Sequence, residues 1–327
     1  MDIQEIVTLS VKHNVSDLHL CSSGNARWRR AGKLEIAPFS APHLGVLMDG
    51  WLSESQQQTW LRQRQLDFSL SLTGCPRLRA SAFAHSGGVS LVLRILPTRC
   101  PTLDELHPPV ALAEMLQEES GLILVTGATG SGKSTTLAAM VDYLNHHQAG
   151  HILTLEDPVE FLHTSEGCLI HQREVGEHAA SFADALRVAL RQDPDVILLG
   201  ELRDSETIRL ALTAAETGHL VLATLHTRGA AQAIERLVDV FPAQEKEPVR
   251  NQLASSLCAV LAQKLQPDNR GGRVALFEML INTPAVGNLI REGKTHQIAG
   301  VMQTGLQSGM QTFSQSYQQR VKAGMLS

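Results

Sequence analysis

The chain has 327 residues, which is enough for about two domains and excludes a small disulfide-stapled protein or a disordered one. Its 28 Lys and Arg against 33 Asp and Glu give a formal net charge of −5, so the overall charge does not attract nucleic acid. Aromatic residues make up only 4%, which disfavours base stacking, and we expect no nucleic-acid partner.

The cysteines are far apart and never form a CxxC pair, so we expect neither a disulfide framework nor a thiolate zinc site. They are Cys21, Cys75, Cys100, Cys168 and Cys258. The N-terminal segment lacks the charged lead and apolar core of a signal peptide, and no apolar run reaches the roughly 18 residues of a membrane span. We expect a cytoplasmic protein, at most peripheral to a membrane.

The first hundred residues predict a small α+β domain. An apolar stripe at Ile3, Ile6, Val7 and Val11 predicts a helix, and alternating segments at 16–20 and 89–96 predict strands. Prolines then cluster between residues 97 and 109, where they discourage both helix and strand. We therefore expect a first domain over 1–99, a linker over 100–110 and a second domain over 111–327.

The second domain alternates short apolar runs with helical patterns, which is typical of a mostly parallel α/β sheet. The runs cover residues 121–127, 151–156, 196–200 and 220–226. Further along, Val249, Leu253, Leu257, Val260 and Leu261 predict a helix.

A phosphate-binding loop follows the first of these runs. Residues 127–134, GATGSGKS, fit the pattern G-x-x-x-x-G-K-[ST] between a predicted strand and a predicted helix. In such a loop the backbone N–H groups face the phosphates, Lys133 reaches the β- and γ-phosphates, and Ser134 ligates Mg²⁺. The expected ATP-binding residues are Gly127, Ala128, Thr129, Gly130, Ser131, Gly132, Lys133, Ser134 and Thr135.

Acidic side chains follow two other predicted strands. Glu201 comes after the run at 196–200, while Glu156 ends the run at 151–156 and Glu160 follows it. The carboxyl ends of parallel strands meet at one sheet edge, so these carboxylates should lie near the phosphates with a Mg²⁺ ion. Solvated turns also collect acids, which is the alternative interpretation for Glu156.

Two histidines flank the run at 220–226, His219 before its first residue and His226 at its end. Seven residues of extended chain span roughly 23 Å, so they cannot share one metal. Spacing alone leaves open whether they are functional or ordinary surface or core residues.

Together the segments GATGSGKST, LEDPVE, DPDVILLGELRD and TGHLVLATLHT resemble the four boxes of the secretion ATPase superfamily, the GspE-like motors of type II and type IV secretion. Residues 284–298 and 303–315 resemble the C-terminal region of its PilT-like branch, the motors of pilus retraction and twitching motility. The resemblance implies a RecA-like P-loop NTPase domain preceded by a small PAS-like α+β domain. It also implies a homohexameric ring that works on a platform protein at the cytoplasmic face of the inner membrane.

The same resemblance implies residue roles. Glu201 matches the family's metal-site glutamate, and Glu160, in preference to Glu156, matches its catalytic base. His219 and His226 match its two histidines. Arginine fingers are expected among Arg77, Arg79 and Arg94.

The C-terminal motif departs from the family at one position, where Gly287 replaces an arginine in a helix tied to retraction. The expected activity is hydrolysis of ATP to ADP and phosphate, coupled to pilus disassembly or a related secretion machine. Three alternatives stay open: an assembly or secretion motor of the same superfamily, an ATP-binding regulator that does not hydrolyse, and a nucleic-acid motor, which the composition disfavours.

Overall fold

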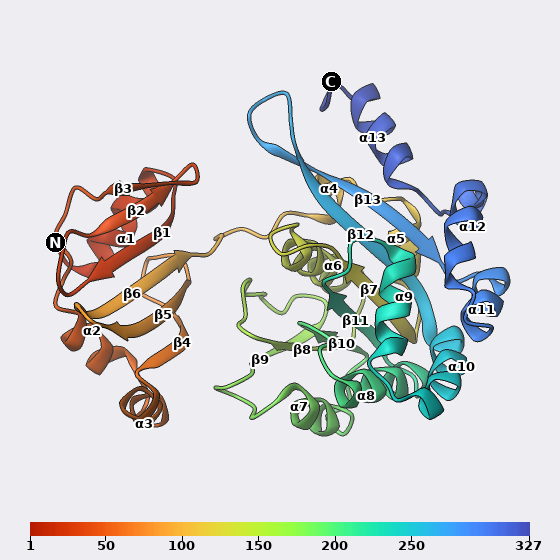
Figure 1. Ribbon diagram of the computed structural model, residues 1–327, viewed down its shortest axis with the longest axis horizontal. Coiled ribbons are helices and arrows are strands. Elements are labelled where there is room, and N and C mark those ends of the chain that lie inside the picture. The colour runs from red at the N-terminus through yellow and green to blue at the C-terminus, as the bar shows by residue number, and fades with distance from the viewer. The chain divides into compact units, whose positions relative to one another are not determined.

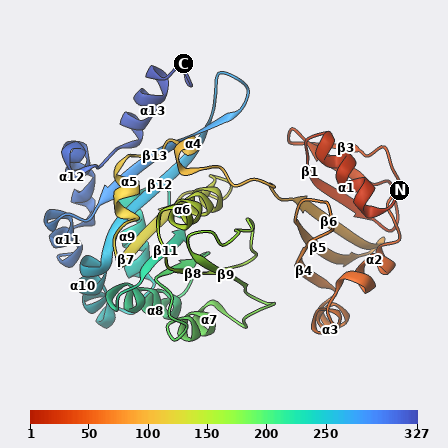
Figure 2. The same cartoon turned by 180° about the vertical axis from the view of Figure 1, so that it is seen from behind.

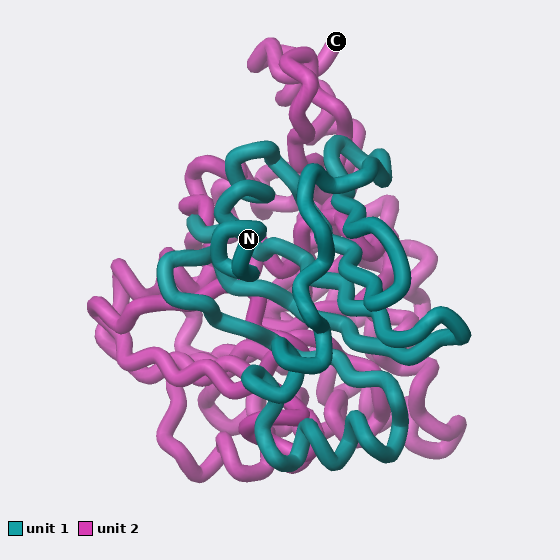
Figure 3. Tube along the Cα trace, turned by 90° about the vertical axis from the view of Figure 1, so that its left-hand side faces the viewer, with its two compact units in different colours: residues 1–99 teal, residues 100–327 magenta.

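The protein is described by a computed structural model that covers all residues 1–327. The chain divides into two compact units, Met1–Arg99 and Cys100–Ser327, coloured separately in Figure 3. Each unit has a hydrophobic core of its own. No helix is both long enough and apolar enough to cross a bilayer.

The first unit is a six-stranded antiparallel sheet with three helices (Figure 1). Helix α1 (Ile3–Lys12) begins with a capping box between Asp2 and Glu5 and buries Ile6 and Val7. The strand order is β3-β2-β1-β6-β5-β4. The strands are β1 (Val15–Cys21), β2 (Arg27–Arg30), β3 (Lys33–Ile36), β4 (Gln65–Leu70), β5 (Leu78–His85) and β6 (Gly88–Ile95), and the other helices are α2 (Leu44–Trp51) and α3 (Glu54–Gln63).

The second unit is built on a seven-stranded sheet of order β13-β12-β7-β11-β10-β8-β9, in which only β13 is antiparallel to its neighbour. The strands are β7 (Gly121–Thr126), β8 (His151–Glu156), β9 (Leu169–Glu174), β10 (Val196–Leu199), β11 (Leu220–Leu225), β12 (Leu257–Pro267) and β13 (Arg273–Ile281). The four expected strands are confirmed as β7, β8, β10 and β11. The two units also confirm the expected fold class, a small α+β domain before a RecA-like α/β domain.

Helices cover both faces of this sheet (Figure 1; Figure 2 gives the view from behind). Alternate residues of β7 serve the two layers: Ile123 and Val125 pack on one side, Leu122 and Leu124 on the other. One layer contains α4 (Leu103–Leu106), α5 (Ala111–Met115) and α6 (Lys133–His147). The other contains α7 (Phe182–Ala189), α8 (Ser205–Glu216), α9 (Ala230–Asp239), α10 (Lys246–Ser256), α11 (Pro284–Arg291) and α12 (Ile298–Thr304). Helix α13 (Phe313–Lys322) packs on β13, and three short 3₁₀ turns lie at Ala243–Glu245, Thr295–Gln297 and Gly305–Ser308.

Two expectations differ from the structure. The helix predicted through Leu261 ends at Ser256, because from Leu257 onward the chain is β12, whose apolar first part, residues 257–262, pairs with β7. Residues 100–110 count with the second unit rather than forming a separate linker. Within them Thr102 and Glu105 form a capping box that starts α4, and Leu103 is buried in the core.

The strand order brings the functional segments to one edge of the sheet. In the parallel register Leu225 of β11 is level with Thr126 of β7, and Leu199 of β10 is level with Ala223 of β11 and Leu155 of β8. Because these strands are parallel, their carboxyl ends lie at the same edge, where ligands bind in open α/β sheets.

Candidate nucleotide site

The loop between β7 and α6 needs glycine at two points for different reasons. Gly132 has φ +91°, a left-handed conformation that L side chains rarely adopt. At Gly127 a Cβ atom would lie only 2.5 Å from the backbone oxygen of Gln263. The motif glycines therefore allow both the turn into α6 and close packing of the loop on β12.

The N-terminus of α6 is available to an anion. Its N-cap is Gly132, which offers no side chain to the free N–H groups of the first turn. Ser134 is exposed in that turn, and the buried hydroxyl of Ser131 has no hydrogen-bond partner. Free N–H groups and the positive end of the helix dipole together make a phosphate-binding site.

Lys133 is turned back onto the loop. Its Nζ donates to the carbonyl oxygens of Gly127 at 2.8 Å and Ala128 at 3.2 Å, and the residue is only 8% exposed. Burial lowers the pKa of Lys133, and the negative charges of Glu201 and Glu160 oppose that effect. The ammonium group thus lies within electrostatic reach of both expected acids.

Glu201 is held on both sides. Its Oε1 lies 2.9 Å from Nε2 of His226, and its Oε2 accepts a hydrogen bond from Nε of Arg203 at 2.7 Å. The other ring nitrogen of His226, Nδ1, lies 3.4 Å from Nζ of Lys133. A charged ammonium can only donate, so Nδ1 accepts and the proton of the neutral ring is on Nε2, the nitrogen nearest Glu201. His226 therefore lies between Lys133, to which it is hydrogen-bonded, and Glu201, which it contacts at ion-pair distance.

The two acids after β8 have different environments. Oε1 of Glu156 accepts from Thr154 Oγ1 at 2.7 Å and from Gln172 Nε2 at 3.3 Å, and burial raises the pKa of its carboxyl group. Glu160 is partly exposed, and its charge acts on Lys133. This placement favours Glu160 over Glu156 as the acid that faces the phosphates.

His219 does not join this group. It precedes the first residue of β11, at the amino end of the strand, whereas His226 follows the last. Its Nδ1 lies 3.1 Å from the carbonyl oxygen of Ala214, at the end of α8. The structure therefore assigns His219 to the helix–strand turn, and of the two expected histidines it brings only His226 to Glu201.

The expected arginine fingers lie in the first unit. Arg79 on β5 is the cross-strand partner of Arg94 on β6, so the two guanidinium groups share one face. Arg94 donates through Nε to Asp17 at 2.8 Å, which engages one side of its guanidinium group. Arg77 comes directly before β5 and is partly buried.

Two residues that contact the loop were missed by the sequence reasoning. Gln263 of β12 and Thr136 of α6 are both buried and bind each other. A single polar residue inside the otherwise apolar run 257–263 was the available signal. The sequence predicts a helix through Leu261, so Gln263 falls just beyond the predicted element.

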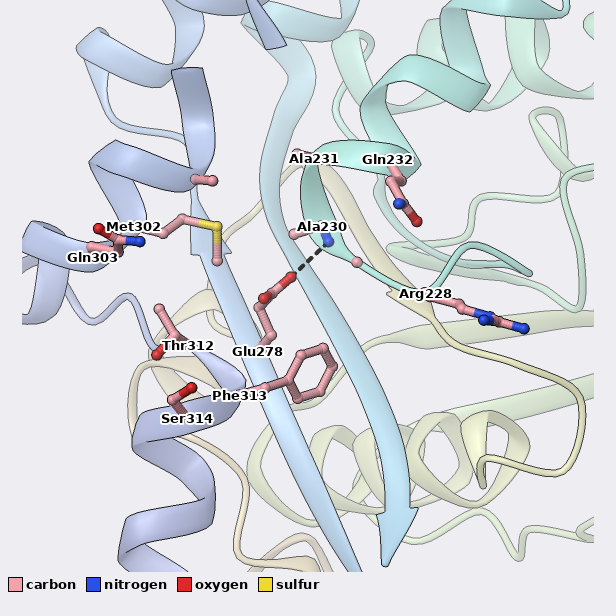
Figure 4. Close-up of a pocket in the computed structure, with 12 residues that line it drawn as sticks. Arg228, Ala230, Ala231, Gln232, Glu278, Met302, Gln303, Thr312, Phe313 and Ser314 are labelled. Atoms are coloured by element: carbon pink, nitrogen blue, oxygen red, sulfur yellow. Dashed lines mark hydrogen bonds between the residues drawn. The ribbon is translucent and has the colours of Figure 1, made fainter. Parts of the chain in front are cut away.

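A separate cavity of about 410 Å³ lies between α9, β13, α12 and α13 (Figure 4). Glu278 of β13 accepts the N–H of Ala230 at 2.9 Å and so caps α9, whose N-cap Gly229 has no side chain to do so. Arg228 points away from Glu278 in Figure 4. No residue of the phosphate loop lines this cavity.

Comparison with known proteins agrees with this geometry. The YggR protein of Escherichia coli strain K12 is 69% identical over 326 residues and covers 100% of both chains. The type IV pilus retraction ATPase PilT of Pseudomonas aeruginosa is 46% identical, covering 100% of this chain and 96% of its own. A crystal structure of the pilus retraction motor PilT with bound ADP superposes with a TM-score of 0.92 at 41% identity, covering 100% of this chain and 95% of that one.

The family model described as type II/IV secretion system protein matches residues 62–327, which include the whole nucleotide site. The relatives of the chain include a twitching motility protein, a pilus retraction ATPase and a type II secretion system protein. The chain belongs to the type II/IV secretion system protein family, and within it resembles the PilT-like ATPases.

Proposed function

We propose that this protein is a ring-forming ATPase that hydrolyses ATP to ADP and phosphate and uses the energy to retract a type IV pilus. The observation that carries the proposal is the convergence of Lys133, His226 and Glu201 beside an uncapped helix N-terminus. The likeness of the whole chain to a PilT structure with bound ADP supports it.

The loop residues bind the polyphosphate. Lys133 leaves the carbonyl oxygens of Gly127 and Ala128 and donates instead to the β- and γ-phosphates, whose negative charge favours the ammonium form that burial disfavours. The backbone N–H groups of the loop and of the first turn of α6 hold the remaining phosphate oxygens.

The residues beside the loop suit a Mg²⁺ ion, because the Ser134 hydroxyl and the Glu201 carboxylate are hard oxygen donors. Both oxygens of Glu201 are already paired, with His226 and Arg203, so we place Glu201 in the water shell of the metal and Ser134 directly on it. When bound, the ion neutralises charge on the β- and γ-phosphate oxygens.

Glu160 accepts the proton of the attacking water as general base, while His226 orients Glu201. Arginines of the first unit, among Arg77, Arg79 and Arg94, stabilise the charge on the transferred phosphoryl group. Such fingers are worth about 10³ to 10⁵ in rate. Loss of the γ-phosphate then lets the two domains move, and a homohexamer of the chain passes this motion to a platform protein at the inner membrane.

Phosphate release by the purified chain tests the chemistry. We expect Mg²⁺-dependent turnover in the parent, and turnover reduced at least about 100-fold in Lys133→Ala and Glu201→Gln. Lys12→Ala and Glu54→Gln, at exposed positions of the first unit, are the matched controls and should retain parental rates. Parental turnover in Lys133→Ala would overturn the proposal, and strong stimulation by single-stranded DNA would favour a nucleic-acid motor.

Deleting the gene tests the biological role. Longer or more numerous surface filaments support retraction. Loss of filaments or of a secreted protein would instead support an assembly or secretion motor. Gly287 makes the filament phenotype informative, because it is the position of α11 at which the chain departs from the C-terminal motif that it otherwise resembles.

A further inference from the structure

Gln263 is a buried polar residue to which the proposed mechanism gives no role. It lies on β12, opposite the fully buried Phe277 of β13, and is only 3% exposed. A buried amide costs free energy unless its donor and acceptor both find partners. The hydrogen-bond partners of the Gln263 amide therefore indicate which part of the structure this residue supports.

Both ends of the Gln263 amide bind the phosphate-loop region. Nε2 donates to the carbonyl oxygen of Ser131 at 2.6 Å, and Oε1 accepts from the hydroxyl of Thr136 at 2.7 Å. A backbone carbonyl can only accept, so the NH₂ end must face Ser131. The hydroxyl of Thr136 must then donate to Oε1, which leaves one consistent arrangement of the three groups.

Gln263 also leaves little room for a side chain at two glycine positions of the loop. Its backbone oxygen lies 2.5 Å from the place where a Cβ of Gly127 would be, and its Nε2 lies 3.1 Å from that of Gly132. Gln263 thus supports the loop near its start and near its end, from the side of β12. A loop that directs its N–H groups toward phosphates must direct carbonyls elsewhere, and Gln263 is the donor that satisfies one of them.

We propose that Gln263 is a positioning residue that holds the loop in its phosphate-binding conformation through Ser131 and Thr136. It does not touch the nucleotide. This inference rests on the proposed nucleotide site and adds to it a requirement from outside the sequence motif.

Nucleotide affinity tests the inference directly. Gln263→Met keeps the length and packing of the side chain but loses both hydrogen bonds, and it should weaken binding of a fluorescent ADP analogue about tenfold. The KM for ATP should rise by a similar factor, while kcat at saturating ATP stays within about threefold of the parent. Gln266→Met on the same strand, whose side chain makes no hydrogen bond to the loop, is the matched control.

Thr136 provides a second pair of variants. These variants test the positioning role of the Gln263–Thr136 hydrogen bond even if Gln263→Met does not fold. Thr136→Ser keeps the hydroxyl and should bind ADP like the parent, whereas Thr136→Val is isosteric, removes the donor and should weaken binding. The double variant Thr136→Val with Gln263→Met should weaken it less than the product of the single effects, because both remove one network.

The outcomes separate this inference from the proposed function. If the parent chain does not bind the ADP analogue, the proposed nucleotide site is wrong. If the parent binds it but Gln263→Met and Thr136→Val bind equally well, the positioning role is wrong. A lower melting temperature with unchanged ADP affinity would also overturn it, since that pattern describes a merely structural contact.

Discussion

Nε2 of His226 lies 2.9 Å from Oε1 of Glu201, and this contact joins the carboxyl ends of two neighbouring parallel strands. Neither residue belongs to the phosphate loop, yet the histidine also reaches Lys133 within it. If the Lys133 side chain moves when a nucleotide binds, the His226 ring can transmit that movement to Glu201.

His226→Ala should lower kcat about 10- to 100-fold, because Glu201 loses the imidazole contact that orients it. His226→Gln can still donate to Glu201 and should retain more activity than the alanine variant. Steady-state phosphate release measures both, with His147→Ala at the exposed end of α6 as the control. Equal rates in the parent and in His226→Ala would show that the contact has no part in turnover.

Glu160→Gln should lower the rate of ATP turnover by a factor of about 10² to 10⁴, because it removes the proton acceptor. It should leave ADP binding intact, because Glu160 does not contact a phosphate. Glu156→Gln should have the smaller effect, since Glu156 is already engaged by Thr154 and Gln172. Single-turnover kinetics with a parallel ADP titration separates the two steps. A larger loss in Glu156→Gln would reverse the assignment of the base.

Glu278 should make folding stability depend on pH. Burial raises the pKa of its carboxyl group above the usual 4.5, so the folded state favours the neutral form. The stability from this group is present below the unfolded pKa and is lost as pH rises through the folded pKa. The free energy of unfolding of Glu278→Gln should therefore rise relative to that of the parent as the pH increases above the unfolded pKa of about 4.5.

Urea unfolding at several pH values measures that difference, with exposed Glu54→Gln as the control. A difference between Glu278→Gln and the parent that stays constant with pH would contradict the prediction.

Gly287→Ala should stabilise the protein by about 0.5 to 1 kcal/mol, because alanine restricts the unfolded chain and favours the helix. The new Cβ would meet only ordinary contacts, the nearest at 3.5 Å to Oδ1 of Asn282. Gly167→Ala is the contrasting case and should destabilise, because its Cβ would lie 2.6 Å from the backbone oxygens of Asn145 and Gln148. Denaturant midpoints for the two variants should move in opposite directions.

Cys21 should be the most reactive thiol at neutral pH. Hydrogen bonds from Ser90 and Ser23, with a smaller contribution from His85, lower the pKa of Cys21 to about 6, whereas burial raises that of Cys258 to about 11. Cys21 is thus mostly thiolate at pH 7, and the thiolate is the nucleophile. Iodoacetamide labelling followed by mass spectrometry should modify Cys21 first, and equal labelling of Cys75 would contradict this.

The phosphate loop and the acids could be predicted from the sequence because their signals are local. A fixed glycine pattern identifies the loop, and parallel strands bring Glu160 and Glu201 to the same edge by geometry alone. The difference between His219 and His226 also follows from strand direction, since one precedes β11 and the other follows it. The motif resemblance assigns His219 and His226 to the same box and so does not distinguish their positions.

The support of the loop from β12 could not be predicted in this way. Gln263 is 132 residues from Ser131, and nothing in the periodicity of either segment indicates their contact. The apolar positions from Val249 to Leu261 fit a helical stripe, so the change to strand at Leu257 depends on the vacant edge of β7 and not on local preference. Likewise, prolines indicated a linker at 100–110, while the burial of Leu103 depends on α6 packing against it.

The position of β12 between β7 and β13 has a wider consequence. Lys264, the residue after Gln263, lies over the ring of Phe313 at 4.6 Å, and Phe277 of β13 donates its N–H to Ser316, so the same pair of strands anchors the C-terminal helix. Substitutions in the last third of the chain can therefore alter the support of the phosphate loop while every residue of the loop itself stays the same.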